Sequence, residues 1–140
     1  MLVATAGKVR AIRDGVPDRP ITDQNRSSLA GKEFGNAVAL RCGDGWETRY
    51  CHLKNGSIRK RAGDIVQPGD VLSQVGMSGL SNFAHLHLSV SRDGHIVDPF
   101  VPEHRNRLFA TCAKRIVARS VHLWPSRAIC GWVFRQHPKL

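Results

Sequence analysis

The chain has 140 residues, a hydrophobic fraction of 41% and a formal net charge of +10. This length predicts a single domain that buries roughly two-thirds of the surface its unfolded chain would expose. No apolar run approaches the roughly 20 residues that cross a bilayer, which argues against a helical membrane span.

The N-terminal third predicts one strand followed by a long loop. Residues 8–14 alternate imperfectly between apolar and polar side chains, as in a short strand. The start of the chain lacks the apolar core of roughly 7–15 residues and the cleavage site of a signal peptide, so no export signal is expected in this chain. Residues 15–35 are polar, rich in Pro, Gly and Ser, and predict a surface loop, a feature that is often functional or mobile.

Two hairpins are predicted farther along the chain. The runs at 36–42 and 46–53 flank a Gly-Asp-Gly turn, and Asp93-Gly94 separates two later alternating runs. Between the hairpins, residues 63–76 hold short apolar pieces bounded by Gly-Asp and Pro-Gly turns. Short strands cut by turns at this spacing are typical of an all-β domain.

The cysteines do not predict a disulfide scaffold. The register of the first hairpin separates Cys51 from Cys42 by about four residues along the strands, beyond the roughly 7 Å that a disulfide can bridge between Cα atoms. Both are therefore predicted to be free thiols. The pairing state of Cys112 and Cys130 stays open.

Most of the positive charge lies at the C-terminal end. Residues 1–102 contain 13 Lys and Arg against 10 Asp and Glu, whereas residues 103–140 contain 8 against Glu103 alone. We therefore expect a β domain at 1–102 and a basic extension at 103–140, in which residues 107–121 fit a short amphipathic helix. The extension fits a cationic segment for a cell-wall or membrane surface, or a stretch read in a shifted frame. It has no nucleic-acid-binding motif, so no nucleic-acid partner is expected.

Two histidines stand one residue apart in the run Phe83 to Val90. In a strand, His85 and His87 share one face with Ser89, while the intervening apolar residues share the other. The two imidazoles lie roughly 6–7 Å apart at the backbone, close enough to reach a common metal ion. The same pattern also describes two exposed histidines on the wet face of a half-buried strand.

A third histidine ends the preceding hairpin. Alternation places Tyr50 and His52 on one face of that strand and Cys51 and Leu53 on the other. An imidazole pKa of about 6.5 suits proton transfer beside a metal-bound water, although a strand-end histidine can also simply bond a carbonyl. The other histidines are not expected to be ligands: His95, His104, His122 and His137.

Three segments in succession, residues 35–53, 63–81 and 84–100, resemble the lysostaphin-like, LytM-type zinc metallopeptidases, which cut peptide cross-bridges in peptidoglycan. The resemblance implies a mostly antiparallel β fold of the duplicated-hybrid-motif kind, with a groove and one zinc ion. It also implies peptidoglycan peptides as partners and a periplasmic or extracellular location. By position, His87 would be a zinc ligand, His85 and His52 the catalytic pair, and Tyr50 a residue lining the groove.

The chain departs from the family at two expected zinc ligands. The family's His-x-x-x-Asp motif precedes the first strand, and this chain has no histidine before His52. Asp14, Asp18 and Asp23 lack a histidine partner, and a site made of the three imidazoles would consume both proton-transfer groups. We therefore expect weak or absent zinc binding and little or no peptidase activity, as in the C-terminal part of a longer exported enzyme.

Two other interpretations compete with that of a truncated enzyme. A non-catalytic module that binds or regulates cell-wall hydrolases would explain the missing motif, but it has no need of all three histidines. A biotinyl or lipoyl carrier is suggested by residues 63–76. That interpretation fails because no lysine stands between Arg61 and Arg92 to carry the cofactor.

Overall fold

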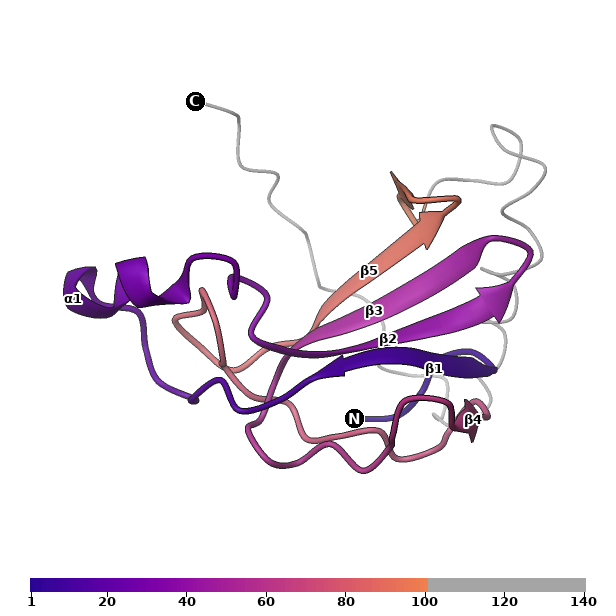
Figure 1. Ribbon diagram of the computed structural model, residues 1–140, viewed down its shortest axis with the longest axis horizontal. Coiled ribbons are helices and arrows are strands. Elements are labelled where there is room, and N and C mark those ends of the chain that lie inside the picture. The colour runs from indigo at the N-terminus through magenta and orange to yellow at the C-terminus, as the bar shows by residue number, and fades with distance from the viewer. Residues whose placement is uncertain (101–140) are drawn as a thin grey trace, which may run out of the picture.

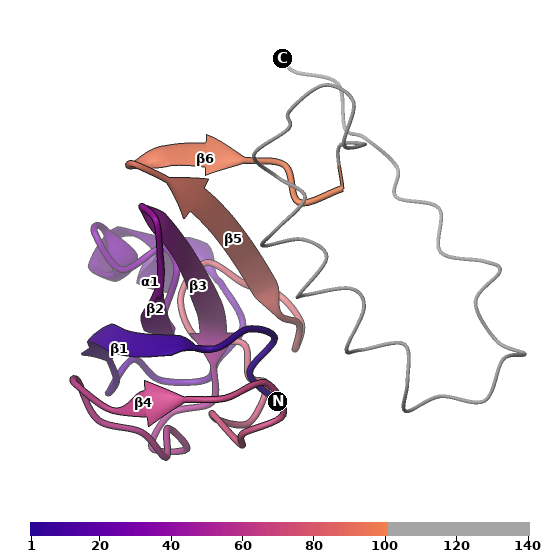
Figure 2. The same ribbon diagram turned by 90° about the vertical axis from the view of Figure 1, so that its right-hand side faces the viewer.

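The structure, a computed structural model, describes residues 1–100 as one antiparallel sheet (Figures 1 and 2). The six strands lie in the order β4-β1-β2-β3-β5-β6, and every neighbouring pair is antiparallel. The predicted all-β class with a mostly antiparallel sheet is therefore confirmed. The strands are β1 (Gly7–Arg13), β2 (Asn36–Gly43), β3 (Trp46–Leu53), β4 (Ile65–Val66), β5 (His87–Arg92) and β6 (His95–Val97).

The basic extension at 103–140 lies outside the described residues, together with its expected helix, Cys112, Cys130 and its three histidines. The boundary at residue 102 thus stays a prediction. None of the helices in the part that the structure describes is long and apolar enough to span a membrane.

Both hairpin turns have the backbone that their sequences predict. Asp44 and Gly45 join β2 to β3 with φ values of 49° and 75°, and Asp93 and Gly94 join β5 to β6 with values of 49° and 84°. Two successive left-handed residues are the geometry of the tight turn that matches the twist of paired strands. The turns set the register that carries Arg49 and His87 onto one sheet face.

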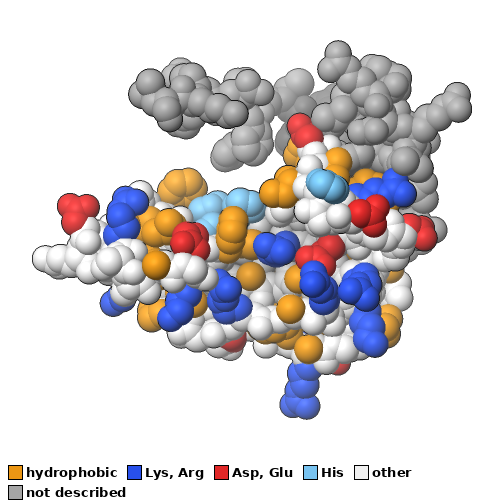
Figure 3. Space-filling view, turned by 45° about the horizontal axis from the view of Figure 1, so that its top comes forward, with side chains coloured by type: hydrophobic (Ala, Val, Ile, Leu, Met, Phe, Trp, Pro, Cys, Tyr) orange, Lys and Arg blue, Asp and Glu red, His pale blue; other side chains and the backbone are white. Residues whose placement is uncertain are grey.

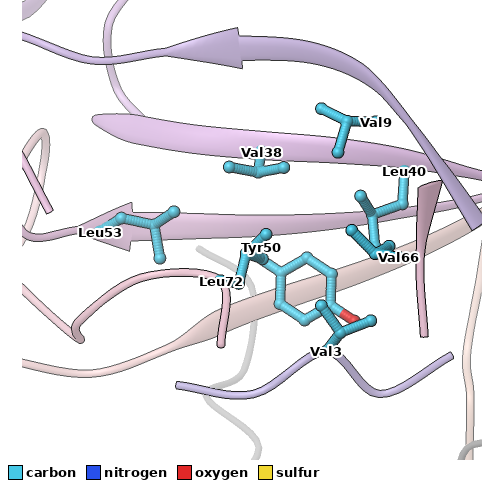
Figure 4. Packing of buried hydrophobic residues seen from close by; sticks show 8 residues of the cluster. All are labelled: Val3, Val9, Val38, Leu40, Tyr50, Leu53, Val66 and Leu72. Carbon is cyan, nitrogen blue, oxygen red and sulfur yellow. The ribbon is translucent and has the colours of Figure 1, made fainter. Parts of the chain in front are cut away.

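The core packs on one face of the sheet against the N-terminal segment and the loops around β4 (Figure 4). Tyr50 is the largest of its fully buried side chains. The eight core residues are Val3, Val9, Val38, Leu40, Tyr50, Leu53, Val66 and Leu72.

The predicted loop at 15–35 contains a short helical segment that the sequence did not reveal. Helix α1 (Asp23–Arg26) runs directly into the 3-10 turn η1 (Ser27–Leu29) and projects from one end of the sheet (Figure 1). Asn25 accepts a hydrogen bond from the Thr22 amide at 3.0 Å, and this local capping allows one helical turn to form without an apolar stripe. The segment is otherwise largely exposed, as expected for a surface loop.

Cys42 and Cys51 are free thiols, as the hairpin register predicted. The register differs from the regular hairpin only at two irregular positions, one near each end of the β2–β3 pair. The irregularity near Asn36 has a direct consequence for His52.

Candidate active site

Three histidines from separate parts of the chain converge at one end of the sheet. The ring of His52 lies 4.7 Å from that of His85 and 5.9 Å from that of His87, measured between ring centroids. His52 comes from the end of β3, His85 from the bridge before β5, and His87 from the first position of β5. Figure 3 shows histidine side chains at two places on this face, a larger group and a smaller separate patch.

His52 reaches this cluster through a left-handed backbone conformation, with φ of 58°. An extended residue would have kept His52 on the face of Tyr50, as alternation predicted. Instead Tyr50 and Leu53 both enter the core, and His52 turns toward the other histidines. The predicted face assignment is thus wrong for His52 and Leu53, because one non-extended residue shifts the alternation by one position.

Backbone bonds hold His52 in this uncommon conformation. Its amide donates to the Phe34 carbonyl, and its carbonyl accepts from the Gly76 amide, each at 3.0 Å. A left-handed non-glycine residue costs about 1–3 kcal/mol and persists only where the surroundings determine it. Such outliers are concentrated at functional sites, which supports a functional role for this end of β3.

Tyr50 does not line the groove that the resemblance implied. Its side chain is 1% exposed, in the centre of the core, and its hydroxyl accepts a hydrogen bond from the Ala4 amide at 3.0 Å. The structure therefore corrects this expectation. The physical reason is the same left-handed residue, which separates Tyr50 from its predicted neighbour His52.

The hydrogen bonds of His52 determine its tautomer. Nδ1 lies 2.7 Å from the Ser78 carbonyl oxygen, which can only accept, so Nδ1 carries the proton and Nε2 the lone pair. Burial lowers the pKa of His52, the Ser78 carbonyl opposes this effect, and the neighbouring His85 and His87 lower the pKa further. His52 is therefore neutral at neutral pH and offers Nε2 as a base.

His85 is oriented in the same way. Its Nδ1 lies 3.0 Å from the Phe83 carbonyl oxygen and 3.2 Å from the Ser81 hydroxyl oxygen. Because the carbonyl can only accept, Nδ1 again carries the proton of the neutral ring. Backbone carbonyls, rather than acidic side chains, thus bind Nδ1 of both imidazoles.

His87 lies where the groove meets the histidine cluster. It is the cross-strand partner of Cys51, and its ring meets the Phe34 ring edge-on at 5.3 Å. The predicted face is confirmed from His87 onward, since His87, Ser89 and Ser91 line the groove and Val90 is buried. Leu86 is exposed because β5 begins only at His87.

The groove has a volume of about 790 Å³ and runs over the face of β2, β3 and β5 opposite the core. Charged and small polar side chains line much of it, in contrast with the apolar core face, and Phe34, Trp46 and Ile96 are its large apolar members. Its lining includes Arg10, Arg41, Glu47, Arg49, Cys51, His87, Ser89 and Ser91.

Ser78 contacts the histidine cluster, a position that the sequence reasoning missed. Its carbonyl orients His52, while its hydroxyl accepts from the Asn36 amide at 2.9 Å and donates to the Leu53 carbonyl at 2.7 Å. A Cβ atom on Gly79 would lie 2.4 Å from the Glu33 carbonyl oxygen, so only glycine lets these two loops approach so closely. The glycines were visible in the sequence, but their spacing does not show which loops meet.

Two of the three carboxylates named as substitute ligands accept hydrogen bonds from backbone amides elsewhere. Asp18 accepts from the amides of Asn55 and Met77, at 2.6 and 2.9 Å, and Asp14 accepts from the Gly15 and Gly56 amides. Within residues 1–100, no group of three His, Cys, Asp or Glu side chains is arranged to hold a metal ion. The described residues therefore do not fit a complete zinc site.

Residues 2–99 match the model of peptidase family M23. The chain therefore belongs to this family of peptidoglycan-directed, zinc-dependent peptidases, as the lysostaphin-like resemblance indicated.

The chain is similar to the DD-carboxypeptidase/endopeptidase Mpg of Neisseria meningitidis, with 38% identity over 91 residues. That match covers 65% of this chain and 19% of Mpg, so it spans about a fifth of the relative.

Two solved structures share the fold. The catalytic domain of the prophage-encoded M23 protein EnpA from Enterococcus faecalis matches with a TM-score of 0.56 at 21% identity, covering 72% of this chain and 67% of that one. A zinc-containing peptidase from Vibrio cholerae matches with a TM-score of 0.50 at 24% identity, covering 67% and 24%.

Proposed function

We propose that the chain carries the histidine half of a peptidoglycan-directed zinc metalloendopeptidase site and has little or no peptidase activity alone. The observation that carries this proposal is the convergence of His52, His85 and His87 at the end of a peptide-sized groove. Family membership supplies the substrate class, peptide cross-links of peptidoglycan. A periplasmic or extracellular location follows from that substrate.

The three histidines take different roles in this proposal. His87 is the residue that we assign to the family's zinc ion. His52 and His85 present Nε2 lone pairs, with which a neutral imidazole can accept a proton from an attacking water. Once protonated, the same nitrogens can donate hydrogen bonds to a developing oxyanion. The Ser78 and Phe83 carbonyls keep each ring in the tautomer that this exchange requires.

Metal binding tests the first part of the proposal. Calorimetric zinc titration of the chain should give weak binding, and His87→Ala should weaken it further, because imidazole is the ligand that this end of the groove offers. His95→Ala is the matched control, since His95 is an exposed histidine of β6. Tight stoichiometric zinc together with cleavage of purified peptidoglycan would contradict the proposed inactivity.

A chimaera tests the catalytic half. Adding the segment of Mpg that precedes its matched region to the N-terminus of this chain should permit cleavage of peptidoglycan if that segment carries the remaining ligands. His52→Ala and His85→Ala should each abolish cleavage in the chimaera while leaving zinc bound. Retained cleavage in either variant would remove that histidine from the catalytic pair.

A non-catalytic module that binds or regulates cell-wall hydrolases is the second candidate. It is favoured by the lack of a three-residue metal group within residues 1–100. In this case the chain should change the rate at which a purified cell-wall hydrolase digests peptidoglycan. The His87→Ala variant should cause the same change in rate. Unchanged digestion with and without the chain would exclude this role for the hydrolase tested.

A further inference from the structure

The part of the groove nearest the histidines is basic. Three guanidinium groups, from Arg10, Arg13 and Arg49, line it and its continuation over β1, and Glu47 is the carboxylate among them. At the far end the lining contains two acidic groups, Asp44 and Asp93 of the hairpin turns, and one basic group, Arg41 near the end of β2. The two ends of the groove therefore differ in charge.

The strand register places Arg49 next to the histidine end. Arg49 pairs with Ser89, and Cys51, two residues farther along β3, pairs with His87. Two residues along a strand correspond to roughly 6.5–7 Å, a distance that an arginine side chain can span. Arg13 pairs with Ala37 on β2, and it lines the continuation of the groove together with Phe34, whose ring contacts that of His87.

Glu47 holds two of these arginines without neutralising the group. One of its oxygens lies 2.5 Å from Arg10 Nη1 and the other 3.5 Å from Arg49 Nη2. The Glu47 side chain is 14% exposed, whereas those of Arg10 and Arg49 are 54% and 47% exposed, so both arginine side chains stay accessible to a ligand. Ala37 and Ala39 lie between them and leave room for a ligand.

We propose that Arg49, together with Arg10 and Arg13, recognises a free carboxylate on a peptide bound in the groove, close to the bond presented to the histidines. A guanidinium presents paired N–H donors that match the two oxygens of a carboxylate. The inference rests on the proposed function and narrows it. The substrate class is a peptidoglycan stem peptide whose cross-linking residue carries an additional free carboxylate, rather than a peptide of neutral residues.

Two peptides that differ by one carboxylate test this directly. The probes are L-alanyl-γ-D-glutamyl-meso-diaminopimelate and the same tripeptide with L-lysine in the third position, which lacks only that carboxylate. Their dissociation constants for the full chain are measured by calorimetry or NMR titration at constant salt. The diaminopimelate peptide should bind about tenfold more tightly, the usual scale of one charge-assisted hydrogen-bond pair.

Arg49→Gln should remove this preference by weakening the diaminopimelate peptide about tenfold while leaving the lysine peptide unchanged. Arg59→Gln is the matched control, because it removes the same charge from an exposed arginine outside the groove lining. It should leave both affinities and the preference intact.

The outcomes distinguish failure of carboxylate recognition from failure of the proposed function. Equal binding of both peptides, or an equal loss for both in Arg49→Gln, would overturn carboxylate recognition while leaving the proposed function standing. Failure of both peptides to bind would overturn the recognition proposal and remove its basis in the proposed function.

Discussion

The two faces of one sheet have opposite chemistry. On β3, Thr48 and Tyr50 are fully buried in the core face, while Glu47, Arg49 and Cys51 line the groove on the other side. The core face is held by apolar contact and tolerates little change in volume. The groove face is held by solvent-screened ion pairs and by loops that approach closely. The stability of the domain should therefore depend mainly on the first face, and ligand binding on the second.

Tyr50→Ala gives the sharpest test of the core face. Removing a fully buried aromatic side chain should destabilise the domain by about 3–5 kcal/mol, since the cavity can collapse only in part. The free energy of unfolding from urea denaturation measures this loss.

Tyr50→Phe is its matched control. It keeps the ring but leaves the Ala4 amide without the hydroxyl acceptor, at a cost of about 1–3 kcal/mol. A loss below 1 kcal/mol for Tyr50→Ala would contradict the buried position of Tyr50 in the core.

Gly79→Ala tests the close approach of loops that supports the groove face. A Cβ atom there would lie 2.4 Å from both the Glu33 carbonyl oxygen and the Gly35 amide nitrogen, at a φ of +82°. We expect a destabilisation of about 1–3 kcal/mol and a shifted NMR signal from the His52 Nδ1 proton, because the neighbouring Ser78 carbonyl must move.

Gly94→Ala distinguishes the effect of steric crowding at Gly79 from the effect of the left-handed backbone alone. Gly94 has nearly the same φ, +84°, but nothing within 4 Å of an added Cβ atom. It should share the cost of the left-handed backbone and leave the His52 signal in place. Equal destabilisation in the two variants would show that the loops do not need their close contact.

The difference between Gly79 and Gly94 also shows what the sequence could predict. Asp93-Gly94 and the Gly-Asp-Gly turn predict hairpins because in each case the two flanking strands are adjacent in the chain. The contact of Gly79 with Glu33 joins loops far apart in sequence, so no local pattern reveals it. Likewise, HxH and the strand-end His52 were identifiable as candidates. The left-handed φ that brings His52 beside His85 and His87 could not be predicted, because strand alternation assumes that every residue is extended.

Alkylation of Cys42 tests how far the thiol is buried at the border of the core face. Burial raises the pKa of its thiol, and the nearby Thr48 hydroxyl opposes that shift. Because the thiolate is the reactive form, iodoacetamide at pH 8 should label Cys42 several-fold more slowly in the folded chain than in urea. In urea the rate should level off once the pH passes the ordinary thiol pKa, whereas in the folded chain it should keep rising above that pH because the thiol pKa is raised. Peptide mass spectrometry reports the labelled fraction, and equal rates in both states would contradict the buried position.

Glu47→Gln should have the smallest effect on stability. Its ion pairs with Arg10 and Arg49 are largely exposed on the arginine side, so their loss should cost about 0–1 kcal/mol, and less at high salt. The groove should instead become more positive and bind the diaminopimelate peptide at least as tightly, provided that the guanidinium groups keep their places. Weaker binding of that peptide with unchanged binding of the lysine peptide would show that Glu47 positions the two arginines. A loss of stability above 2 kcal/mol would mean that the groove face contributes to folding as strongly as the core face.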